Sequence, residues 1–284
     1  MTEVLALVIS YNRPDNMPTL RNLDRHGFTG PVRILVADDD PKLDQYLELH
    51  GDKVIEFNKE AAEEFFDPGD NFQSRNASVY PRAVAHKVAA DLGYRWFVQL
   101  DDDYTGFHYR FKNDRTYDKR NIGSLDLVID AMVEFAEETG VLVAMSQGGE
   151  WMGGANCQLG VAIRSKRKAM NWFVCDTENP VDFPGKLNED VNMYTEGQRR
   201  GDVTALTLSH TSLEQADTQG SDGGITDMYL SVGTYVKSMY SVMRCPSAVV
   251  CTPMPGGVTP RLHHRVTYNR CAPKIISETH RRAK

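Results

Sequence analysis

Several apolar stretches of this chain stop abruptly at clusters of polar residues. Of all the features of the sequence, this alternation of apolar and polar segments restricts the possible folds most strongly. Four such stretches near the N-terminus are predicted as strands: residues 4–9, 32–37, 53–57 and 94–100. Residues 15–27 and 76–92 carry apolar side chains at helical spacing. Strands that alternate with helices in this way predict parallel βαβ units, with helices on both faces of a sheet.

The rest of the chain continues the same alternation without a linker or an internal repeat. Helices are expected at 124–139, 165–173, 188–200 and 226–243, and strands at 141–146, 159–163 and 204–210. We therefore predict a single α/β domain over residues 1–260, with a central, mostly parallel sheet flanked by helices. Residues 261–284 are expected to form a helical and basic C-terminal extension that packs on or near the active site.

Composition excludes several classes of protein. The 284 residues are 41% hydrophobic and 25% charged, which is ordinary for a globular chain and unlike a disordered or coiled-coil one. No apolar run is long enough to cross a membrane, and the first residues lack the basic start of a secretory signal. The five cysteines show no CxxC spacing, so we expect reduced thiols and a cytoplasmic protein.

Charge is distributed unevenly along the chain. The net charge is −7, but residues 261–284 contain seven basic residues, one acidic residue and three histidines. A basic end of this kind can meet phosphates. A solvated tail would have the same composition, so the charge leaves both interpretations open.

Asp101, Asp102 and Asp103 directly follow the strand at 94–100. Adjacent carboxylates repel one another unless a cation lies between them. Mg²⁺ and Mn²⁺ are held by oxygen ligands, typically one or two carboxylates together with the phosphates of a substrate. Side chains two residues apart on a strand point the same way, so Asp101 and Asp103 are predicted to share one metal ion. The alternative is an acidic turn that faces solvent.

Polar residues also follow the first two strands. Tyr11 can stack on a nucleobase, and Arg13 can pair with a phosphate. After the second strand, a carboxylate of Asp38, Asp39 or Asp40 can accept hydrogen bonds from a ribose or a base, although Asp40 also suits a turn. Because the carboxyl ends of parallel strands meet at one edge of a sheet, we expect the three clusters to form one site.

The segments S-Y-N-R-P, V-A-D-D-D and R-W-F-V-Q-L-D-D-D, in this order, resemble the GT-A glycosyltransferases. The resemblance implies a nucleotide-sugar donor, predicted here to be a UDP-sugar, and a D-x-D motif that holds a divalent metal (Mn²⁺ or Mg²⁺) on the donor diphosphate. We expect the nucleotide-sugar to be contacted by Tyr11, Arg13, Asp39, Arg75, Arg82, Asp101, Asp102 and Trp151.

Two later motifs fit the same resemblance. Glu189 and Asp190 open a predicted helix, where inverting GT-A enzymes often carry the general base that deprotonates the acceptor hydroxyl. Asp190 is predicted to be this base and Glu189 is the second candidate, although acidic residues also favour helix N-termini. His210 ends a predicted strand and is expected to complete the metal shell, with His263 or His264 as competing candidates.

The C-terminal part narrows the resemblance. The pair Gly223-Gly224, residues 233–242, and the segment R-L-H-H-R at 261–265 with P-K-I at 273–275 together look like the TET-associated glycosyltransferases, which are found mainly in bacteriophages. This implies transfer of the sugar to 5-hydroxymethylcytosine in double-stranded DNA, in the host cell cytoplasm if the chain is phage-encoded. We also expect the transfer to invert the anomeric configuration. We expect DNA contacts from Arg164, Lys166, Arg199, His263, His264 and Arg265.

Three other functions are compatible with parts of this pattern. The same fold can transfer a sugar to a glycan, a lipid or a protein. A non-catalytic nucleotide-sugar- or DNA-binding module is a second alternative, but it would be free to lose some of the predicted metal and catalytic residues. A nucleotidyltransferase is the third, and it would need a glycine-rich phosphate loop where this chain has S-Y-N-R-P.

Overall fold

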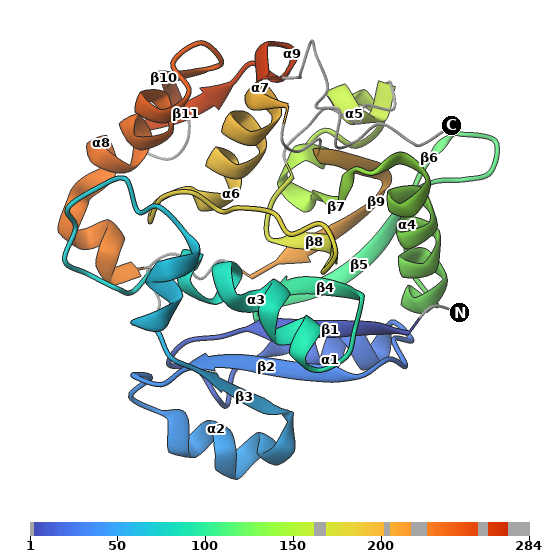
Figure 1. Ribbon diagram of the computed structural model, residues 1–284. Coiled ribbons are helices and arrows are strands. Elements are labelled where there is room, and N and C mark those ends of the chain that lie inside the picture. Colours follow the sequence, from blue (N-terminus) through green and yellow to red (C-terminus); the bar gives the residue numbers. More distant parts are fainter. Residues whose placement is uncertain (1–2, 162–168, 202–204, 217–225, 255–260, 272–284) are drawn as a thin grey trace, which may run out of the picture.

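The computed structural model describes residues 3–161, 169–201, 205–216, 226–254 and 261–271 (Figure 1). Its centre is a mixed sheet in the order β3-β2-β1-β4-β8-β7-β9-β5-β6. The strands of this sheet are β1 (Val4–Ile9), β2 (Val32–Ala37), β3 (Val54–Phe57), β4 (Trp96–Asp101), β5 (Tyr104–Phe111), β6 (Tyr117–Asn121), β7 (Leu142–Gln147), β8 (Trp172–Asp176) and β9 (Ala205–Gln215). A separate antiparallel hairpin pairs β10 (Val249–Met254) with β11 (Arg261–Val266).

Helices cover both faces of the sheet. They are α1 (Pro18–Arg25), α2 (Leu43–His50), α3 (Val79–Asp91), α4 (Leu125–Thr139), α5 (Gln158–Val161), α6 (Glu189–Asn192), α7 (Gln198–Arg200), α8 (Thr226–Arg244) and α9 (Tyr268–Cys271). A π-helical turn, Met193–Gly197, joins α6 to α7. α8 is bent at Gly233, whose φ of 75° lies in the left-handed region that glycine adopts easily.

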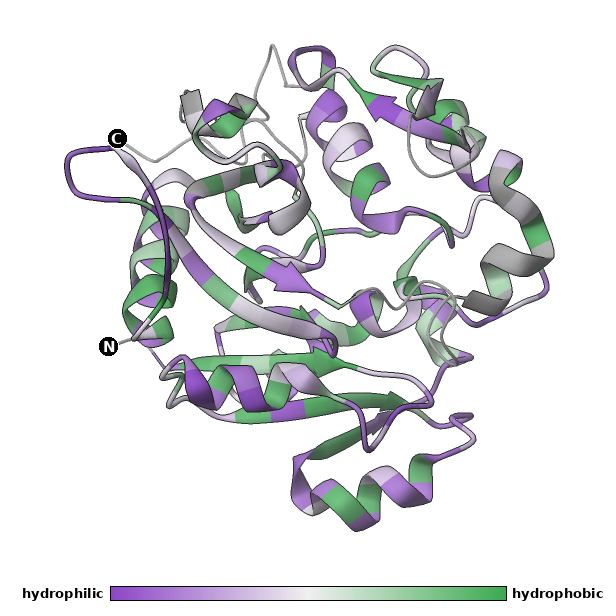
Figure 2. Cartoon of the chain, turned by 180° about the vertical axis from the view of Figure 1, so that it is seen from behind, coloured by the Kyte–Doolittle hydropathy of each residue, from purple (hydrophilic) through white to green (hydrophobic). Residues whose placement is uncertain are grey.

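β1 is buried along its whole length because it lies inside the sheet between β2 and β4. Leu5 and Leu7 pack on one face in the same core as Val84 of α3, and Val8 packs on the other face in the same core as Ile129 of α4. Figure 2 shows the result, with hydrophobic green concentrated in the central strands and mixed colours on the covering helices. The sheet is therefore the middle of three layers.

The direction of the strands gathers several chain segments at one edge. β1 pairs in parallel with β2 and with β4, and β2 pairs in parallel with β3, so the carboxyl ends of these strands lie at the same edge. At this edge Ile9 lies opposite Asp101. β9 ends at the same edge, because Gln215 lies opposite Tyr104 at the start of β5. This edge is the only place where the polar clusters that follow β1, β2 and β4 can meet.

The α/β class is confirmed, and the parallel pairing is confirmed for the first four strands. Beyond β4 the sheet is mixed, because β8 runs antiparallel to both of its neighbours and β5 does the same. The strand expected at 159–163 is wrong, since α5 occupies Gln158–Val161. The helix expected at 165–173 is also wrong at its end, where β8 begins at Trp172; residues 162–168 lie outside the described part of the chain.

The division of the chain at residue 260 stays a prediction. Arg261–Val266 forms β11, which pairs with β10 and contacts α8. Within the described residues, no helix combines the length and the apolar character that a membrane span needs.

His86 is the one histidine of α3, and it is buried. Its Nε2 accepts a hydrogen bond from the backbone N–H of Val181 at 3.4 Å, and its ring meets the edge of Phe97. Burial lowers the pKa of His86 to about 4, and Asp176 opposes this shift only in part. His86 is therefore neutral in the folded protein near neutral pH.

This histidine makes stability depend on pH. Its pKa is near 6.5 in an unfolded chain and about 4 in the folded protein, so the unfolded state binds more protons in acid. The stability is full above pH 6.5 and falls as the pH drops from there toward 4. We expect His86→Leu to reduce the loss of unfolding free energy between pH 7 and pH 4.5 by about 2 to 3 kcal/mol, measured by urea denaturation. An equal loss in both proteins would contradict the assignment.

Candidate active site

The polar clusters that follow β1, β2 and β4 come together as predicted. Ser10, next after β1, donates a hydrogen bond from Oγ to Oδ2 of Asp102 at 2.5 Å. The backbone N–H of Asn12 donates to Oδ2 of Asp40 at 2.8 Å. These bonds join the loop after β1 to the loops after both neighbouring strands, so the three clusters form one polar edge.

Asp102 faces into the protein and not toward a ligand. Besides the bond from Ser10, it forms an ion pair with Arg13, whose NH2 lies 3.1 Å from Oδ1. Burial raises the pKa of Asp102 to about 6, and Arg13 opposes this rise. Asp102 was expected beside the donor; the structure uses it to anchor the loop that carries Tyr11 and Arg13.

Asp101 and Glu189 share one buried arginine. NH2 of Arg82 lies 2.7 Å from Oδ1 of Asp101, and its Nε lies 3.0 Å from Oε1 of Glu189. The side chain of Arg82 is only 1% exposed, which differs from the expected contact with a ribose or a diphosphate. Arg82 is buried because it lies on the face of α3 that packs against the sheet. The spacing of residues in the sequence did not show that Arg82 lies on this face.

Asp103 is held at the same edge by the end of β9. Nε2 of Gln215 donates to Oδ1 of Asp103 at 2.8 Å, and the backbone N–H of Ala216 donates to the carbonyl of Asp103 at 2.9 Å. Asp103 is buried, while the side chain of Asp101 is 19% exposed. The two carboxylates that were predicted to hold a metal therefore lie at the same edge of the sheet, close enough for their charges to interact.

The electrostatics of this pair suit a cation. Burial raises the pKa of Asp101 to about 8 and Arg82 opposes the rise, but the carboxylates of Asp103 and Asp102 reinforce it. A cation beside these carboxylates would relieve the repulsion. No set of three His, Cys, Asp or Glu side chains is arranged as a metal site within the described residues. Two carboxylates completed by a donor diphosphate fit the oxygen-rich coordination of Mg²⁺ or Mn²⁺.

A lysine organises the part of the site predicted for the nucleoside. Nζ of Lys59 lies 2.7 Å from Oδ1 of Asp39 and 4.9 Å from the centre of the Tyr11 ring. The side chain of Lys59 is buried, whereas Asp39 is half exposed. Lys59 follows β3 by two residues, so the rule that placed the other strand-end clusters would have found it. Gln215 was missed because β9 was expected to end at His210.

Arg75 lies at the outer rim of this region. Its Nε donates to Oε1 of Glu63 at 3.0 Å, and the hydroxyl of Tyr80 donates to the same oxygen. The Arg75 side chain is largely exposed. A ligand contact by Arg75 would therefore compete with an existing ion pair.

Glu189 and Asp190 begin α6 and are both buried. The chain enters this helix through Asn188, whose φ of 53° lies in the left-handed region. Nδ2 of Asn188 donates to the carbonyl of Lys237 at 2.8 Å, which fixes the turn against α8. The helix start thus brings the Glu189 carboxylate to the edge that carries Asp101, as the two ion pairs of Arg82 show. The charge of Asp190 also acts on Arg82.

His210 does not join this site. β9 continues to Gln215, so His210 lies five residues before the strand end, on the order of 15 Å from it. The ring of His210 packs against Phe111, at the far end of β5 from the site. His263 and His264 lie on β11 with their rings stacked 4.3 Å apart. His210 therefore does not lie beside Asp103 in this structure, and a role of His263 or His264 as the ligand stays a prediction.

Trp151 is buried in a small aromatic cluster and is only 4% exposed. Its ring contacts Phe111 and Tyr117, Arg110 lies over it, and its Nε1 donates to Oγ of Ser146 at 2.9 Å. The expected contact of Trp151 with the nucleotide-sugar does not fit this burial. Glycines flank Trp151 in the sequence, but the indole folds back onto the sheet.

Within the described residues, those expected to contact DNA lie on two elements, α7 and β11. Arg164 and Lys166 lie outside the described residues. Arg199 is exposed on α7, and Arg265 is exposed on β11. These side chains stay predictions for DNA contact.

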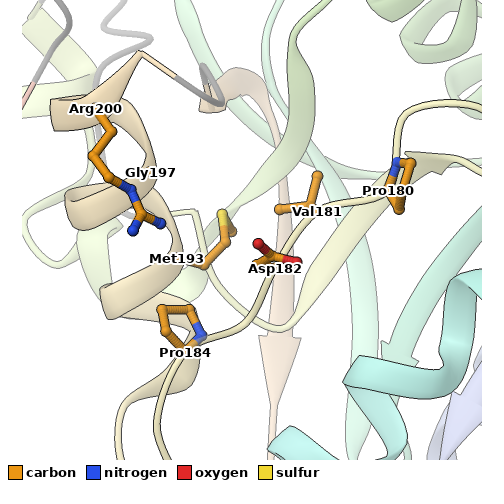
Figure 3. A pocket seen from close by; sticks show the side chains of 7 residues that line it. All are labelled: Pro180, Val181, Asp182, Pro184, Met193, Gly197 and Arg200. Atoms are coloured by element: carbon orange, nitrogen blue, oxygen red, sulfur yellow. The ribbon is translucent and has the colours of Figure 1, made fainter. Parts of the chain in front are cut away.

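A pocket lies beside the helical segment α6–α7, lined by Pro180, Val181, Asp182, Pro184, Met193, Gly197 and Arg200 (Figure 3). It contains none of the predicted donor or metal residues. Figure 3 shows Asp182 on the loop before α6 and Arg200 on the helix, at different sides of this pocket. The polar edge and this pocket are therefore separate features.

The sequence matches the model of one protein family, the TET-Associated Glycosyltransferase family, over residues 6–224. The match covers more than half of the chain and includes the three strand-end clusters together with Glu189 and Asp190. This is a family of glycosyltransferases. The chain belongs to the TET-associated glycosyltransferase family.

Other comparisons give only distant similarity. No curated protein matches the sequence. Among solved structures, glucosyl-3-phosphoglycerate synthase from Mycobacterium tuberculosis, in complex with Mn²⁺, UDP-glucose and phosphoglyceric acid, has 10% identity and a TM-score of 0.45 over 91% of this chain and 89% of that chain. S. aureus TarS has 15% identity and a TM-score of 0.38 over 77% of this chain and 61% of that chain.

The burial of Trp151 predicts that it stabilises the fold without contacting the donor. Trp151→Ala should lower the free energy of unfolding by about 3 to 5 kcal/mol, because it removes a large buried ring. The affinity of the folded variant for UDP should not change. Chemical denaturation and isothermal titration with UDP and Mn²⁺ measure the two quantities.

Tyr11→Ala is the matched control, since it removes an aromatic ring at the edge of the site. This variant should show the opposite pattern, with weaker UDP binding and little change in stability. Loss of UDP affinity in a stably folded Trp151→Ala protein would show that the indole contacts the donor.

Proposed function

We propose that this glycosyltransferase transfers a sugar from a UDP-sugar to the hydroxymethyl group of 5-hydroxymethylcytosine in double-stranded DNA, with a divalent metal and with inversion. The observation that carries the proposal is the polar edge itself. It combines a carboxylate pair suited to a cation with buried carboxylates at the start of α6, in a chain of the TET-associated family. The family description supports the DNA acceptor.

The donor is proposed to lie across the ends of β1, β2 and β4. Tyr11 and Asp39, which Lys59 holds together, are placed to bind the nucleoside. Arg13, which forms an ion pair with Asp102, is proposed to contact a phosphate of the donor. Asp101 and Asp103 would hold Mn²⁺ or Mg²⁺, which when bound neutralises the charge of the leaving diphosphate.

Asp190 is proposed as the general base. Oε1 of Glu189 is already bound by Arg82, so Glu189 is the less suitable proton acceptor of the two. The acceptor hydroxyl transfers its proton to Asp190 while its oxygen forms the new bond to the anomeric carbon. The bond from this carbon to the diphosphate oxygen breaks, and UDP leaves from the opposite face. Direct attack of this kind inverts the anomeric configuration.

The DNA is proposed to approach from the side of α7 and β11, where Arg199 and Arg265 are exposed. Arg164, Lys166, His263 and His264 are retained as further candidates for contacts to DNA. Extrusion of the modified base would bring its hydroxyl to Asp190. The proposed compartment is the cytoplasm, that of the host cell if the protein is phage-encoded.

The direct test is sugar transfer to DNA. Purified protein, Mn²⁺ and a panel of UDP-sugars are incubated with DNA that contains 5-hydroxymethylcytosine, and digested nucleosides are analysed by mass spectrometry. We expect a gain of one sugar mass on the modified cytosine. The gain should disappear with Asp103→Ala, because the leaving diphosphate then lacks its cation.

DNA with unmodified cytosine is the matched control and should gain no mass. Binding and slow hydrolysis of a UDP-sugar without transfer to DNA would contradict the DNA acceptor. A glycan, lipid or protein acceptor would then be the better hypothesis.

A further inference from the structure

Arg82 uses every nitrogen of its guanidinium group inside the protein. NH2 contacts Asp101 at 2.7 Å, Nε contacts Glu189 at 3.0 Å, and NH1 donates to Oε1 of Gln99 at 3.3 Å. Gln99 is fully buried on β4, two residues before Asp101. An arginine bound in this way cannot turn toward a ligand without leaving two carboxylates and a buried amide.

The surroundings of Arg82 also fix the plane of the guanidinium group. Its Cζ lies 5.7 Å from the centre of the Phe173 ring and 5.9 Å from that of the Phe183 ring. Both rings are buried. Aromatic faces attract a guanidinium and hold its orientation. A lysine at this position would keep the charge but would lose the planar group that reaches both carboxylates.

The two carboxylates bound by Arg82 belong to opposite halves of the proposed reaction. Asp101 ends β4 and belongs to the side of the donor and its cation, whereas Glu189 begins α6, next to the proposed base Asp190. Among the ion pairs of the described residues, those of Arg82 join these two side chains directly. Core packing and the bond of Asn188 to α8 also hold α6 in place, and Arg82 adds the link between the two carboxylates themselves.

We propose that Arg82 is a positioning residue that aligns the acceptor base with the donor site by bridging Glu189 and Asp101, and that it does not contact the nucleotide. This inference rests on the proposed function, since it assigns the two carboxylates to the donor and acceptor sides. It predicts that a change at Arg82 affects turnover and leaves nucleotide affinity intact.

The first test uses Arg82→Lys, which keeps the positive charge. We expect kcat to fall about 100-fold, as for a misplacement of about 1 Å at a reacting group. The dissociation constant for UDP in the presence of Mn²⁺ should stay within about threefold of the wild-type value. A tenfold or greater loss of UDP affinity in the folded variant would mean that Arg82 contacts the nucleotide, and it would overturn the inference.

The second test asks whether Arg82 acts through Glu189. We expect Glu189→Gln to lower kcat, and the double variant Arg82→Lys/Glu189→Gln to be no slower than the slower single variant. Independent roles would instead multiply the two losses in kcat, and this result would overturn the inference. Arg95→Lys is the matched control, because Arg95 also bridges carboxylates but lies exposed and away from the site; its kcat should equal that of the wild type.

Glu189→Asp tests the same bridge without a change at Arg82. It shortens the carboxylate by one methylene and keeps the charge, so it should break the bond to Nε, lower kcat and preserve UDP affinity. Full activity of Glu189→Asp would overturn the inference even if Arg82→Lys does not fold.

A wild-type protein that binds UDP but does not modify DNA contradicts only the proposed acceptor. The same comparisons are then made on hydrolysis of the UDP-sugar, followed by release of UDP.

Discussion

Burial of carboxylates at the ends of adjacent strands is the constraint on which this site depends. Asp101, Asp102, Asp103 and Glu189 would repel one another in a region of low polarity, and an unpaired buried charge costs several kcal/mol. Two arginines compensate part of this charge: Arg82 binds Asp101 and Glu189, and Arg13 binds Asp102. Burial raises the pKa of Asp101, and the carboxylates of Asp103 and Asp102 reinforce the rise. A divalent cation beside Asp101 and Asp103 would relieve this repulsion.

The topology of the sheet explains why these groups meet. The parallel strands β1, β2 and β4 bring their following loops to one edge, and β9 returns to the same edge in the mixed half of the sheet. α3 packs on one face of the sheet and carries Arg82. The helix α8 fixes the turn that starts α6. The donor residues, the proposed base and the arginine that links them therefore come from five separate parts of the chain.

The N-terminal half of this arrangement could be predicted from the sequence, because strands buried on both faces are continuous apolar runs and their ends are marked by polar clusters. The boundaries around residues 159–176 could not, since short apolar runs fit a helix or a strand equally well. The sequence also could not predict where the side chains of Arg82, Trp151 and His210 point. Each depends on tertiary packing: the inner face of α3, the fold of a loop back onto the sheet, and the continuation of β9 to Gln215.

The central claim is that Asp101 and Asp103, without His210 as a ligand, hold the cation together with the donor diphosphate. Titration of Mn²⁺ in the presence of UDP, followed by electron paramagnetic resonance, tests this claim most directly. We expect His210→Ala to bind Mn²⁺ like the wild type, and Asp103→Asn to bind it at least about tenfold more weakly. Unchanged Mn²⁺ affinity in Asp103→Asn, or its loss in His210→Ala, would contradict the account.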